Sequence, residues 1–314
     1  MVNTMIPSPR KILFSGASGM IGTALIRAAD AEQIQIIQLI RRKPANLREI
    51  SWNPQVDKPV EDLASLEGMD AAIHLAGANL SSHRWTSAYK REIAESRVAA
   101  TRALVKVLKA LKQPPATLLC ASATGIYGNR GSEVLTEESE PGQGFLADTC
   151  RAWEAEADVA SEIGIRVVHL RFGVVLTAEG GALRQMLPIF RLGLGGTLGN
   201  GKQWMSWITL SDLVRAVFYL LDSAAIDSPI NLVAPNPVTN AEFTRALGHA
   251  LHRPTMIPAP AFALRVAFGE MANEALLAST RAVPERLSRS GFVFELPDIS
   301  SALKAILYPL PPTP

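Results

Sequence analysis

The chain has 314 residues, of which 48% are hydrophobic and 19% are charged, and its formal net charge is +2. This length and apolar content allow a sizeable buried core, in one large α/β unit with an appended lobe or in two domains. The small net charge, without a block of five basic residues, gives no basis for nucleic-acid binding. The N-terminus lacks an apolar signal core and no apolar run reaches the ~20 residues of a bilayer span, so we expect a soluble, cytoplasmic protein without a membrane partner.

The cysteines and histidines indicate neither a disulfide framework nor a metal site. Cys120 and Cys150 belong to no C-x-x-C pair, which favours reduced thiols in a cytoplasmic core. The five histidines are scattered without the spacing of metal ligands. We therefore expect no bound metal.

The first two-thirds of the chain alternates apolar runs with helical patterns. Buried strands are predicted at residues 11–16, 34–40, 70–77, 116–124 and 166–176. Helices are predicted at residues 23–31, 85–111 and 145–164. These strands do not alternate strictly between apolar and polar residues, and helices separate them. This pattern predicts an α/β fold with a Rossmann-type doubly wound parallel sheet that is covered on both faces.

Beyond residue 176 the pattern changes. A helix and a glycine-rich loop precede a capped helix within residues 236–254, and residues 291–307 predict a short strand and a last helix. We expect an N-terminal tail over residues 1–10, a dinucleotide-binding domain over residues 11–235 and a smaller C-terminal substrate-side lobe over residues 236–314. Residues 177–209 of the first domain are expected to contribute to the substrate pocket.

The segment FSGASGMIG, residues 14–22, follows the first predicted strand and opens the first helix. Gly16 permits a tight turn, Gly19 lets the backbone approach a pyrophosphate, and Gly22 allows close helix packing. The helix N-terminus adds unpaired amides and a partial positive charge. A tight strand-to-helix turn without a ligand is the alternative interpretation. The spacing of the three glycines predicts that a dinucleotide binds at this loop.

Two later segments extend this prediction. Arg41, Arg42 and Lys43 follow the second strand, where an NAD site usually carries a carboxylate. Cations there favour NADP over NAD because they bind a 2′-phosphate, whereas a solvated basic loop is the alternative. The sequence HLAG, residues 74–77, ends another strand with small residues, as a backbone that passes the adenine and ribose requires.

Several segments carry a family resemblance. SGASGMIG, HLAG, SATGIYG at residues 122–128 and RFGVVL resemble the extended short-chain dehydrogenase/reductase superfamily. ESRVAATRAL, FLADTCRAWEAEA, LGLGGTLGNGKQWMSWI and NLVAPNPVTNAEF resemble, more specifically, its atypical YfcH-type epimerase-like group, over residues 11–307.

This resemblance implies a Rossmann sheet, a bound NADP, a C-terminal domain of unknown function and an epimerase-like role. Glu92 and Arg97 would contact the cofactor from the long helix, although both could equally form a solvated helix face. The implied cofactor contacts are Gly16, Ala17, Ser18, Gly19, Met20, Ile21, Gly22, Arg41, Arg42, Leu75, Ala76, Gly77, Glu92 and Arg97.

In that superfamily a tyrosine and a lysine four residues later share one helix, and the ammonium lowers the pKa of the tyrosine for proton transfer. The matching positions here are Leu146 and Cys150, and neither side chain can perform this chemistry. Each alternative acid also has a structural interpretation. Tyr127 could pack the end of a strand, Asp148 could cap a helix, and Cys150 could be an inert core thiol. The candidates for catalysis are Ser122, Thr124 and Tyr127, with Asp148 and Cys150 also near the expected crevice.

The glycine-rich loop over residues 193–208 predicts a cover for the substrate. Gln203, Ser206 and Trp207 offer hydrogen bonds and an aromatic wall to a polar substrate, although Trp207 could instead pack the lobe. Arg171 offers a positive charge to an anionic group. Asp212 is expected in the first turn of a helix, where the helix dipole favours a carboxylate.

These features together predict an NADP-dependent epimerase or oxidoreductase that acts on a small polar substrate, sugar-like substrates included, without the Tyr-x-x-x-Lys proton relay. The alternative is a non-catalytic NADP(H)-binding sensor or regulatory protein. A small molecule is the expected partner, and the chain is expected to be a monomer or a homodimer.

Overall fold

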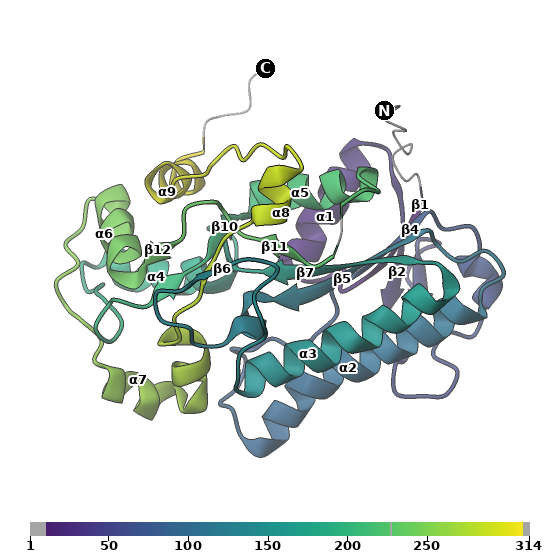
Figure 1. Ribbon diagram of the computed structural model, residues 1–314, viewed down its shortest axis with the longest axis horizontal. Coiled ribbons are helices and arrows are strands. Elements are labelled where there is room, and N and C mark those ends of the chain that lie inside the picture. The colour runs from purple at the N-terminus through teal and green to yellow at the C-terminus, as the bar shows by residue number, and fades with distance from the viewer. Residues whose placement is uncertain (1–10, 227, 310–314) are drawn as a thin grey trace. The chain divides into compact units, whose positions relative to one another are not determined.

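The computed structural model describes residues 11–226 and 228–309 (Figure 1), so the predicted tail over residues 1–10 lies outside the described residues. The chain forms two compact units from interleaved segments. Unit 1 comprises Met1–Ser122, Thr149–Leu170 and Val214–Ile230, and unit 2 comprises Ala123–Asp148, Arg171–Leu213 and Asn231–Pro314. The domain division predicted at residue 235 cuts the chain once, whereas each compact unit contains three separate segments. The predicted division stays a prediction.

A seven-stranded sheet with the order β11-β7-β5-β4-β1-β2-β3 organises the fold, and most of its strands belong to unit 1. The neighbouring pairs from β3 through β2, β1 and β4 to β5 are parallel. All four residues of β4 are buried, as expected for a parallel strand covered on both faces. The predicted α/β fold with a doubly wound parallel sheet is confirmed. The strands are β1 Lys11–Ser15, β2 Gln35–Ile40, β3 Glu49–Ser51, β4 Ala71–His74, β5 Thr117–Ala123, β7 Arg166–Phe172 and β11 Ile230–Leu232.

The helices that cover this sheet begin and end close to the predicted residues. In Figure 1, α2 and α3 lie side by side, and ion pairs join Arg102 to Glu156 and Lys109 to Glu162. The Thr86 hydroxyl accepts from the backbone of Tyr89 and so caps α2. The helical elements are α1 Met20–Ala31, η1 Leu63–Leu66, α2 Ser87–Ala110, α3 Phe145–Asp158, η3 Val159–Ile163 and α5 Leu210–Asp222.

Unit 2 combines three short strand pairs with small helices. Strands β8 and β10 pair in parallel, β9 and β12 antiparallel, and β6 and β13 in parallel. The strands are β6 Val134–Leu135, β8 Val174–Leu176, β9 Trp204–Met205, β10 Trp207–Thr209, β12 Val238–Thr239 and β13 Arg281–Ala282. The helical elements are η2 Thr124–Tyr127, α4 Gly181–Arg191, α6 Asn240–Leu251, α7 Ala261–Phe268, the π-helical η4 Ala272–Leu276, α8 Glu285–Arg289 and α9 Ile299–Leu307.

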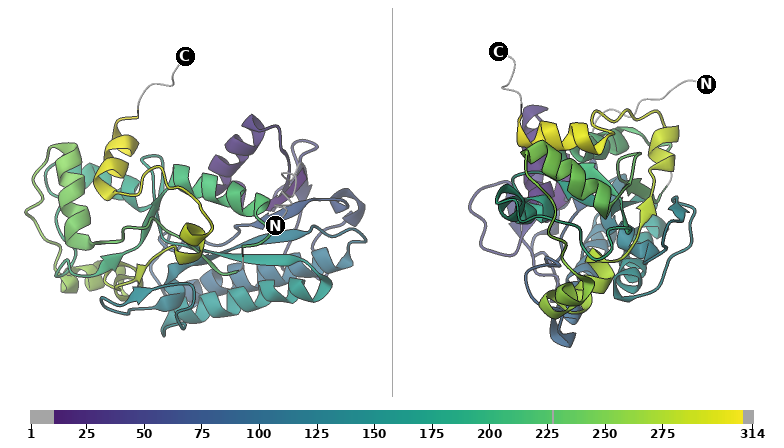
Figure 2. Two further views of the ribbon diagram at one scale, coloured as in Figure 1. Left: turned by 45° about the horizontal axis from the view of Figure 1, so that its top comes forward. Right: turned by 90° about the vertical axis from the view of Figure 1, so that its left-hand side faces the viewer.

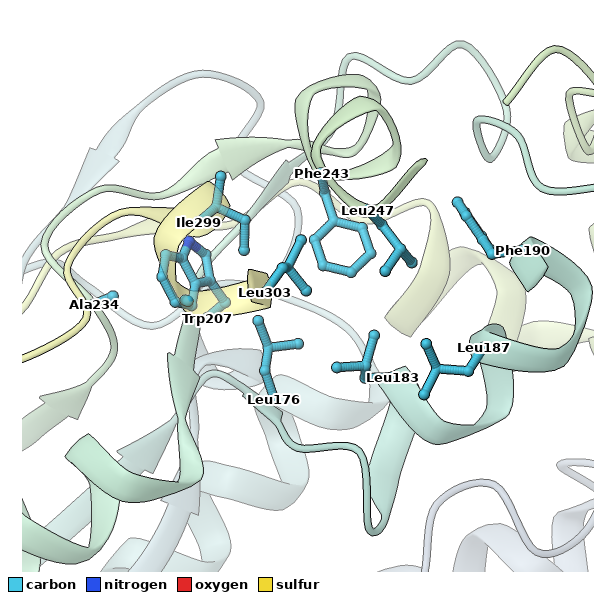
Figure 3. Packing of buried hydrophobic residues seen from close by; sticks show 11 residues of the cluster. Leu176, Leu183, Leu187, Phe190, Trp207, Ala234, Phe243, Leu247, Ile299 and Leu303 are labelled. Atoms are coloured by element: carbon cyan, nitrogen blue, oxygen red, sulfur yellow. The ribbon is translucent and has the colours of Figure 1, made fainter. Parts of the chain in front are cut away.

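The core of unit 2 lies where α4, α6, α9 and the strands β8 and β10 meet (Figure 3). Figure 2 shows α9 lying beside α6. The predicted cap of α6 is present as a capping box, in which Thr239 and Glu242 bond each other's backbone. Trp207 has no exposed surface, and its indole Nε1 donates to the carbonyl oxygen of Asn236 at 3.0 Å. The cluster comprises Leu176, Leu183, Leu187, Phe190, Trp207, Ala234, Phe243, Leu247, Ile299, Ala302 and Leu303.

Two predicted strands differ from the structure. The run over residues 166–176 is broken between β7 and β8 at Gly173, where a Cβ atom would lie 2.6 Å from the carbonyl oxygen of Ser206. The short strand predicted after residue 291 is absent, because the amides of Glu295 and Leu296 donate to the carboxylate of Asp212 rather than to a neighbouring strand. Asp212 does lie in the first turn of α5, and it also holds this C-terminal segment.

Candidate functional site

The glycine loop of unit 1 joins β1 to α1. Gly16 has a φ of 83°, which side chains with a Cβ rarely adopt, and the Gly19 amide donates to the Gly16 carbonyl oxygen at 3.2 Å. Gly19 is the extended N-cap residue of α1, and no side chain in the described part of the protein caps this helix. The amides of the first helical turn therefore point to a space that an anion can fill at the positive end of the helix dipole.

The three glycines of this loop differ in how much room surrounds them. A Cβ atom on Gly16 would lie 2.6 Å from the carbonyl carbon of Leu75. A Cβ atom on Gly22 would overlap the carbonyl oxygen of Gly16 and lie 2.9 Å from that of Ala17. At Gly19 the nearest atom would be 3.5 Å away, which is an ordinary contact, and the backbone has a φ of −74°. The fold thus requires glycine at positions 16 and 22 but not at position 19.

The end of β4 lies directly beside the glycine loop. The Leu75 amide donates to the carbonyl oxygen of Ser15 at 2.9 Å, and Gly16 packs against the backbone of Leu75 and Ala76. The structure therefore brings these two sequence-predicted contacts next to the loop. Beneath them, His74 Nδ1 bonds the hydroxyl of Ser15, and burial lowers the pKa of His74 to about 4, so its imidazole is neutral at physiological pH.

Arg97 of α2 is a half-buried cation at the edge of this region. Its guanidinium donates to the carbonyl oxygens of Ile93 at 2.9 Å and Ala78 at 3.0 Å, lies over the ring of Trp153 and packs against Gly77. No carboxylate among the described residues pairs with it, and burial lowers the pKa of the guanidinium. A desolvated cation held by neutral groups alone favours an anionic partner.

The other predicted cofactor residues lie on more exposed positions. Arg41 follows β2 and is exposed, whereas Arg42 donates two hydrogen bonds to the carboxylate of Glu49, one of them at 2.9 Å. These bonds hold the pKa of Glu49 below its usual range, so part of the Arg42 charge is already compensated. Glu92 is exposed on α2. Binding of a 2′-phosphate by the two arginines stays a prediction, and both side chains are exposed, although Arg42 is already paired with Glu49.

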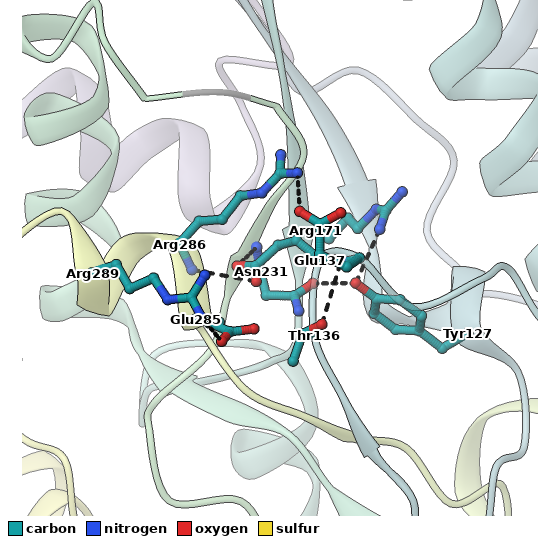
Figure 4. A network of polar contacts seen from close by, with 9 residues as sticks. Tyr127, Thr136, Glu137, Arg171, Asn231, Glu285, Arg286 and Arg289 are labelled. Atoms are coloured by element: carbon teal, nitrogen blue, oxygen red, sulfur yellow. Dashed lines mark hydrogen bonds and ion pairs between the residues drawn. The ribbon is translucent and has the colours of Figure 1, made fainter.

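Ser122 and Tyr127 are both buried and hydrogen-bonded. In unit 1, the Ser122 hydroxyl donates to the Glu154 carboxylate at 2.6 Å, a pairing that the sequence did not reveal. In unit 2, the Tyr127 hydroxyl donates to Asn231 Oδ1 at 2.7 Å and accepts from Arg171 at 3.0 Å (Figure 4). Burial raises the pKa of Tyr127, which disfavours the phenolate that a proton relay needs. These contacts favour a structural role for Tyr127 and Arg171.

The start of α3 holds the position at which related enzymes carry their tyrosine, here Leu146. Gly125 of η2 faces this side chain, since a Cβ atom there would lie 3.4 Å from the Leu146 Cβ. The Leu146 amide donates to the carboxylate of Glu274 at 3.2 Å, and this carboxylate also packs against Gly144. The structure therefore brings Thr124, the neighbour of Gly125, and a carboxylate from the C-terminal part of the chain to the same region of unit 2.

Sequence spacing gave no signal for Glu274, because 128 residues separate it from Leu146. Asp148 is exposed in the first turn of α3, and Cys150 is buried in the same helix. The other thiol, Cys120, is fully buried, and burial raises its pKa, so it has the properties of an inert core residue.

The predicted substrate-loop residues make internal contacts in unit 2. The Gln203 amide donates to the carbonyl oxygens of Leu198 and Leu276. The Ser206 hydroxyl bonds the backbone of β13, and Trp207 lies in the core cluster described above. These contacts favour the packing interpretation of Trp207, and the predicted pocket roles of the three side chains stay predictions.

Comparison with known proteins decides the family. A model of the NAD dependent epimerase/dehydratase family matches residues 12–233, and a model named domain of unknown function DUF1731 matches residues 259–306. The chain belongs to the NAD dependent epimerase/dehydratase family. This confirms the resemblance found in the sequence, including the C-terminal domain of unknown function.

Members of this family match nearly the whole chain. Epimerase family protein Mb2239 of Mycobacterium bovis is 43% identical over 292 residues, which cover 93% of this chain and 96% of that protein. The crystal structure of human epimerase family protein SDR39U1, isoform 2, with NADPH superposes with a TM-score of 0.86 at 33% identity and covers 96% of this chain and 100% of that one. A nucleoside-diphosphate sugar epimerase from Corynebacterium glutamicum has a TM-score of 0.77 at 35% identity, covering 96% of this chain and 58% of that one.

Membrane-spanning helices and metal-binding clusters are both absent from the described residues. None of their helices is both long enough and apolar enough to cross a bilayer. They also contain no group of three histidine, cysteine, aspartate or glutamate side chains placed to hold a metal ion.

Proposed function

We propose that this family member is an NADP(H)-dependent epimerase or oxidoreductase that acts on a small polar substrate without a tyrosine–lysine relay. The observation that carries the proposal is the room at Gly19. The fold accommodates a side chain there, and close approach of a ligand to the backbone would explain glycine at the centre of the loop. Human SDR39U1, which is similar over the whole chain, was crystallised with NADPH, and this supports the same cofactor here.

The cofactor would be held by the glycine loop and its neighbours in unit 1. The first-turn amides of α1 would bind the diphosphate, and Leu75 and Ala76 would flank the adenosine side. Arg97 is a half-buried cation without a carboxylate partner among the described residues, which fits an anionic group of the cofactor. Arg41 and Arg42 would bind the 2′-phosphate and favour NADP over NAD.

When bound, the nicotinamide would supply a hydride acceptor or donor, so the protein itself has only to move a proton. Glu274 holds its carboxylate at the turn of α3 where related enzymes carry tyrosine, and Thr124 lies next to Gly125, which faces the same turn. We assign Glu274 as the candidate proton acceptor for a substrate hydroxyl and Thr124 as the candidate hydrogen-bond donor that orients it. Ser122 and Tyr127 already make buried hydrogen bonds, so they are weaker candidates.

The test has two stages. Nucleotide-free protein is titrated with NADPH and NADH, and an absence of affinity for both would overturn the proposal. A panel of nucleoside-diphosphate sugars and simple polyols is then followed through the absorbance of reduced nicotinamide, with NMR analysis because an epimerase returns the hydride. Glu274→Gln keeps an oxygen to accept from the Leu146 amide, so its folding and NADPH affinity are expected to match the wild type while turnover falls about 100-fold or more.

A cofactor-binding sensor is the second candidate, and Leu146 and Cys150 in place of the proton relay favour it. A redox sensor must bind NADPH and NADP⁺ with different affinities, because only a difference in binding free energy shifts a conformational equilibrium. Calorimetry with both forms distinguishes the two candidates. Equal affinities together with turnover of any panel substrate would exclude the sensor.

A further inference from the structure

Two segments of unit 2 expose large apolar side chains to solvent. The first is the end of α4 and the turn after it, where Leu192 is 74% exposed. The second runs from the loop after α6 into α7, where Met256 is 84%, Val266 is 72% and Phe262 is 70% exposed. Phe262 and Val266 are one turn apart on α7, whereas Leu264 between them is buried, so α7 presents an apolar face to solvent. Ile189, Leu194 and Ile257 are also more than half exposed.

These two segments are neighbours in space. The Ala259 amide donates to the carbonyl oxygen of Thr197 at 2.8 Å, and the Gly199 amide donates to the carbonyl oxygen of Ala259 at 2.8 Å. Gly193 packs against the ring of Pro254. We define the basic apolar surface as the exposed apolar side chains of residues 189–194 and 256–266. The definition includes the arginines within and next to these two segments.

The charge of the same segments is of one sign. Residues 180–211 and 243–269 contain no aspartate or glutamate, although acidic and basic residues are nearly equal in number over the whole chain, at 29 and 31. The cations in the two segments are Arg184, Arg191, Lys202, Arg245, Arg253 and Arg265. Exposed apolar side chains, in segments whose charged residues are all cations, are complementary to an anionic amphiphile.

We propose that the basic apolar surface binds the surface of an anionic phospholipid bilayer. Phe262, Val266, Leu192 and Met256 insert into the interface, while the arginines contact the lipid phosphates. A protein without a membrane-spanning helix can lie on a membrane in this way, so the absence of a span is no argument against it.

Two other occupants fit less well. A second copy of the chain, placed face to face, would bring the same cations against each other. A peptide ligand usually fills a groove whose walls shield the lining side chains, whereas these four side chains are 70% exposed or more and therefore protrude. Protruding apolar side chains with flanking cations are the pattern of an interfacial anchor.

The test is sedimentation of the full-length protein with sucrose-loaded vesicles of phosphatidylcholine alone or mixed with phosphatidylglycerol. We expect binding to the mixed vesicles only, weakened by added salt. Phe262→Ser/Val266→Ser and Arg191→Gln/Arg253→Gln should each weaken binding by about tenfold or more. The matched controls are Leu47→Ser/Val56→Ser and Arg91→Gln/Lys304→Gln, which remove exposed apolar and basic side chains elsewhere and should change binding by less than about twofold.

Thermal unfolding of every variant distinguishes lost binding from lost folding, since surface substitutions should leave the midpoint unchanged. The proposal is overturned by equal binding to both vesicle types, by no binding, or by equal losses in the controls. A dimer that Phe262→Ser/Val266→Ser abolishes, without vesicle binding, would assign the surface to a second copy. Binding of a polyglutamate peptide without vesicle binding would assign it to an acidic protein partner.

Discussion

Replacing Gly22 with alanine should destabilise the protein, whereas replacing Gly19 with serine should leave the fold intact and weaken NADPH binding. The added Cβ atom of Gly22→Ala overlaps the carbonyl oxygen of Gly16. The overlapping atoms are backbone atoms of a loop with a positive φ, so they cannot move aside as a flexible side chain would. Overpacking of this kind costs about 1–3 kcal/mol, and the higher helix propensity of alanine returns about 1 kcal/mol. We expect a net loss of about 2 kcal/mol, at the upper end because the backbone is rigid.

Gly19→Ser provides the matched comparison within the same loop. Its Cβ atom has 3.5 Å of room, and serine is at least as good an N-cap residue as glycine, so the stability should change by less than about 0.5 kcal/mol. The serine side chain occupies the space next to the first-turn amides of α1. NADPH affinity should therefore fall about 10- to 100-fold, which corresponds to about 1.4–2.8 kcal/mol.

The assay combines thermal unfolding of the nucleotide-free variants by circular dichroism with NADPH titration by fluorescence. Gly22→Ala should unfold at a lower temperature, and Gly19→Ser should unfold with the wild type. NADPH binding by Gly19→Ser at wild-type strength would refute the argument that a ligand explains this glycine. A loss of stability in Gly19→Ser as large as that in Gly22→Ala would refute the steric distinction between the two positions.

Three further predictions concern the cations, the buried tyrosine and the buried histidine. Arg41→Ala/Arg42→Ala should weaken NADPH about tenfold or more and NADH less than about twofold, measured by calorimetry; equal losses would assign both arginines to ordinary surface. Tyr127→Phe should lower the unfolding free energy by about 1–3 kcal/mol, measured by urea titration, because buried polar atoms of Asn231 and Arg171 lose their partner. In the folded protein the pKa of His74 is lowered from 6.5 to about 4. As the pH falls, His74 is therefore protonated in the unfolded chain before it is protonated in the folded protein. The free energy of unfolding should decrease between these two pH values by up to about 3 kcal/mol. His74→Leu should flatten the fall of the thermal midpoint over that range, and identical slopes would contradict a neutral buried imidazole.

The sequence was most informative where a local pattern determines the structure. Runs of branched apolar residues predicted the central parallel strands, because a strand covered on both faces must be apolar throughout. The spacing of Gly16, Gly19 and Gly22 predicted the strand–loop–helix unit, and two of the three glycines meet the steric limits expected for them. The capped helix was predicted within residues 236–254, and its cap is local, since the reciprocal bonds of Thr239 and Glu242 span only three residues.

The sequence was least informative where distant segments meet. Glu274 reaches the start of α3 across 128 residues, and no spacing rule connects the two segments. The compensation of Arg42 by Glu49 follows from the pairing of β2 with β3, a three-residue strand too short to be recognised. The sequence left a pocket wall and lobe packing open for Trp207, and its side chain belongs to a core to which α4, α6 and α9 also contribute.

The residues proposed to hold the cofactor and those proposed to move the proton come from different units. The glycine loop, Leu75, Ala76 and Arg97 all belong to unit 1, whereas Thr124 and Glu274 belong to unit 2. None of the proposed cofactor contacts therefore depends on the tyrosine–lysine pair, whose positions are Leu146 and Cys150 here. Substitutions at Thr124 and Glu274 should then alter turnover while NADPH affinity stays within about twofold of the wild type, because they remove no proposed cofactor contact. A marked loss of NADPH affinity in Glu274→Gln, with an unchanged unfolding midpoint, would show that this carboxylate belongs to the cofactor site instead.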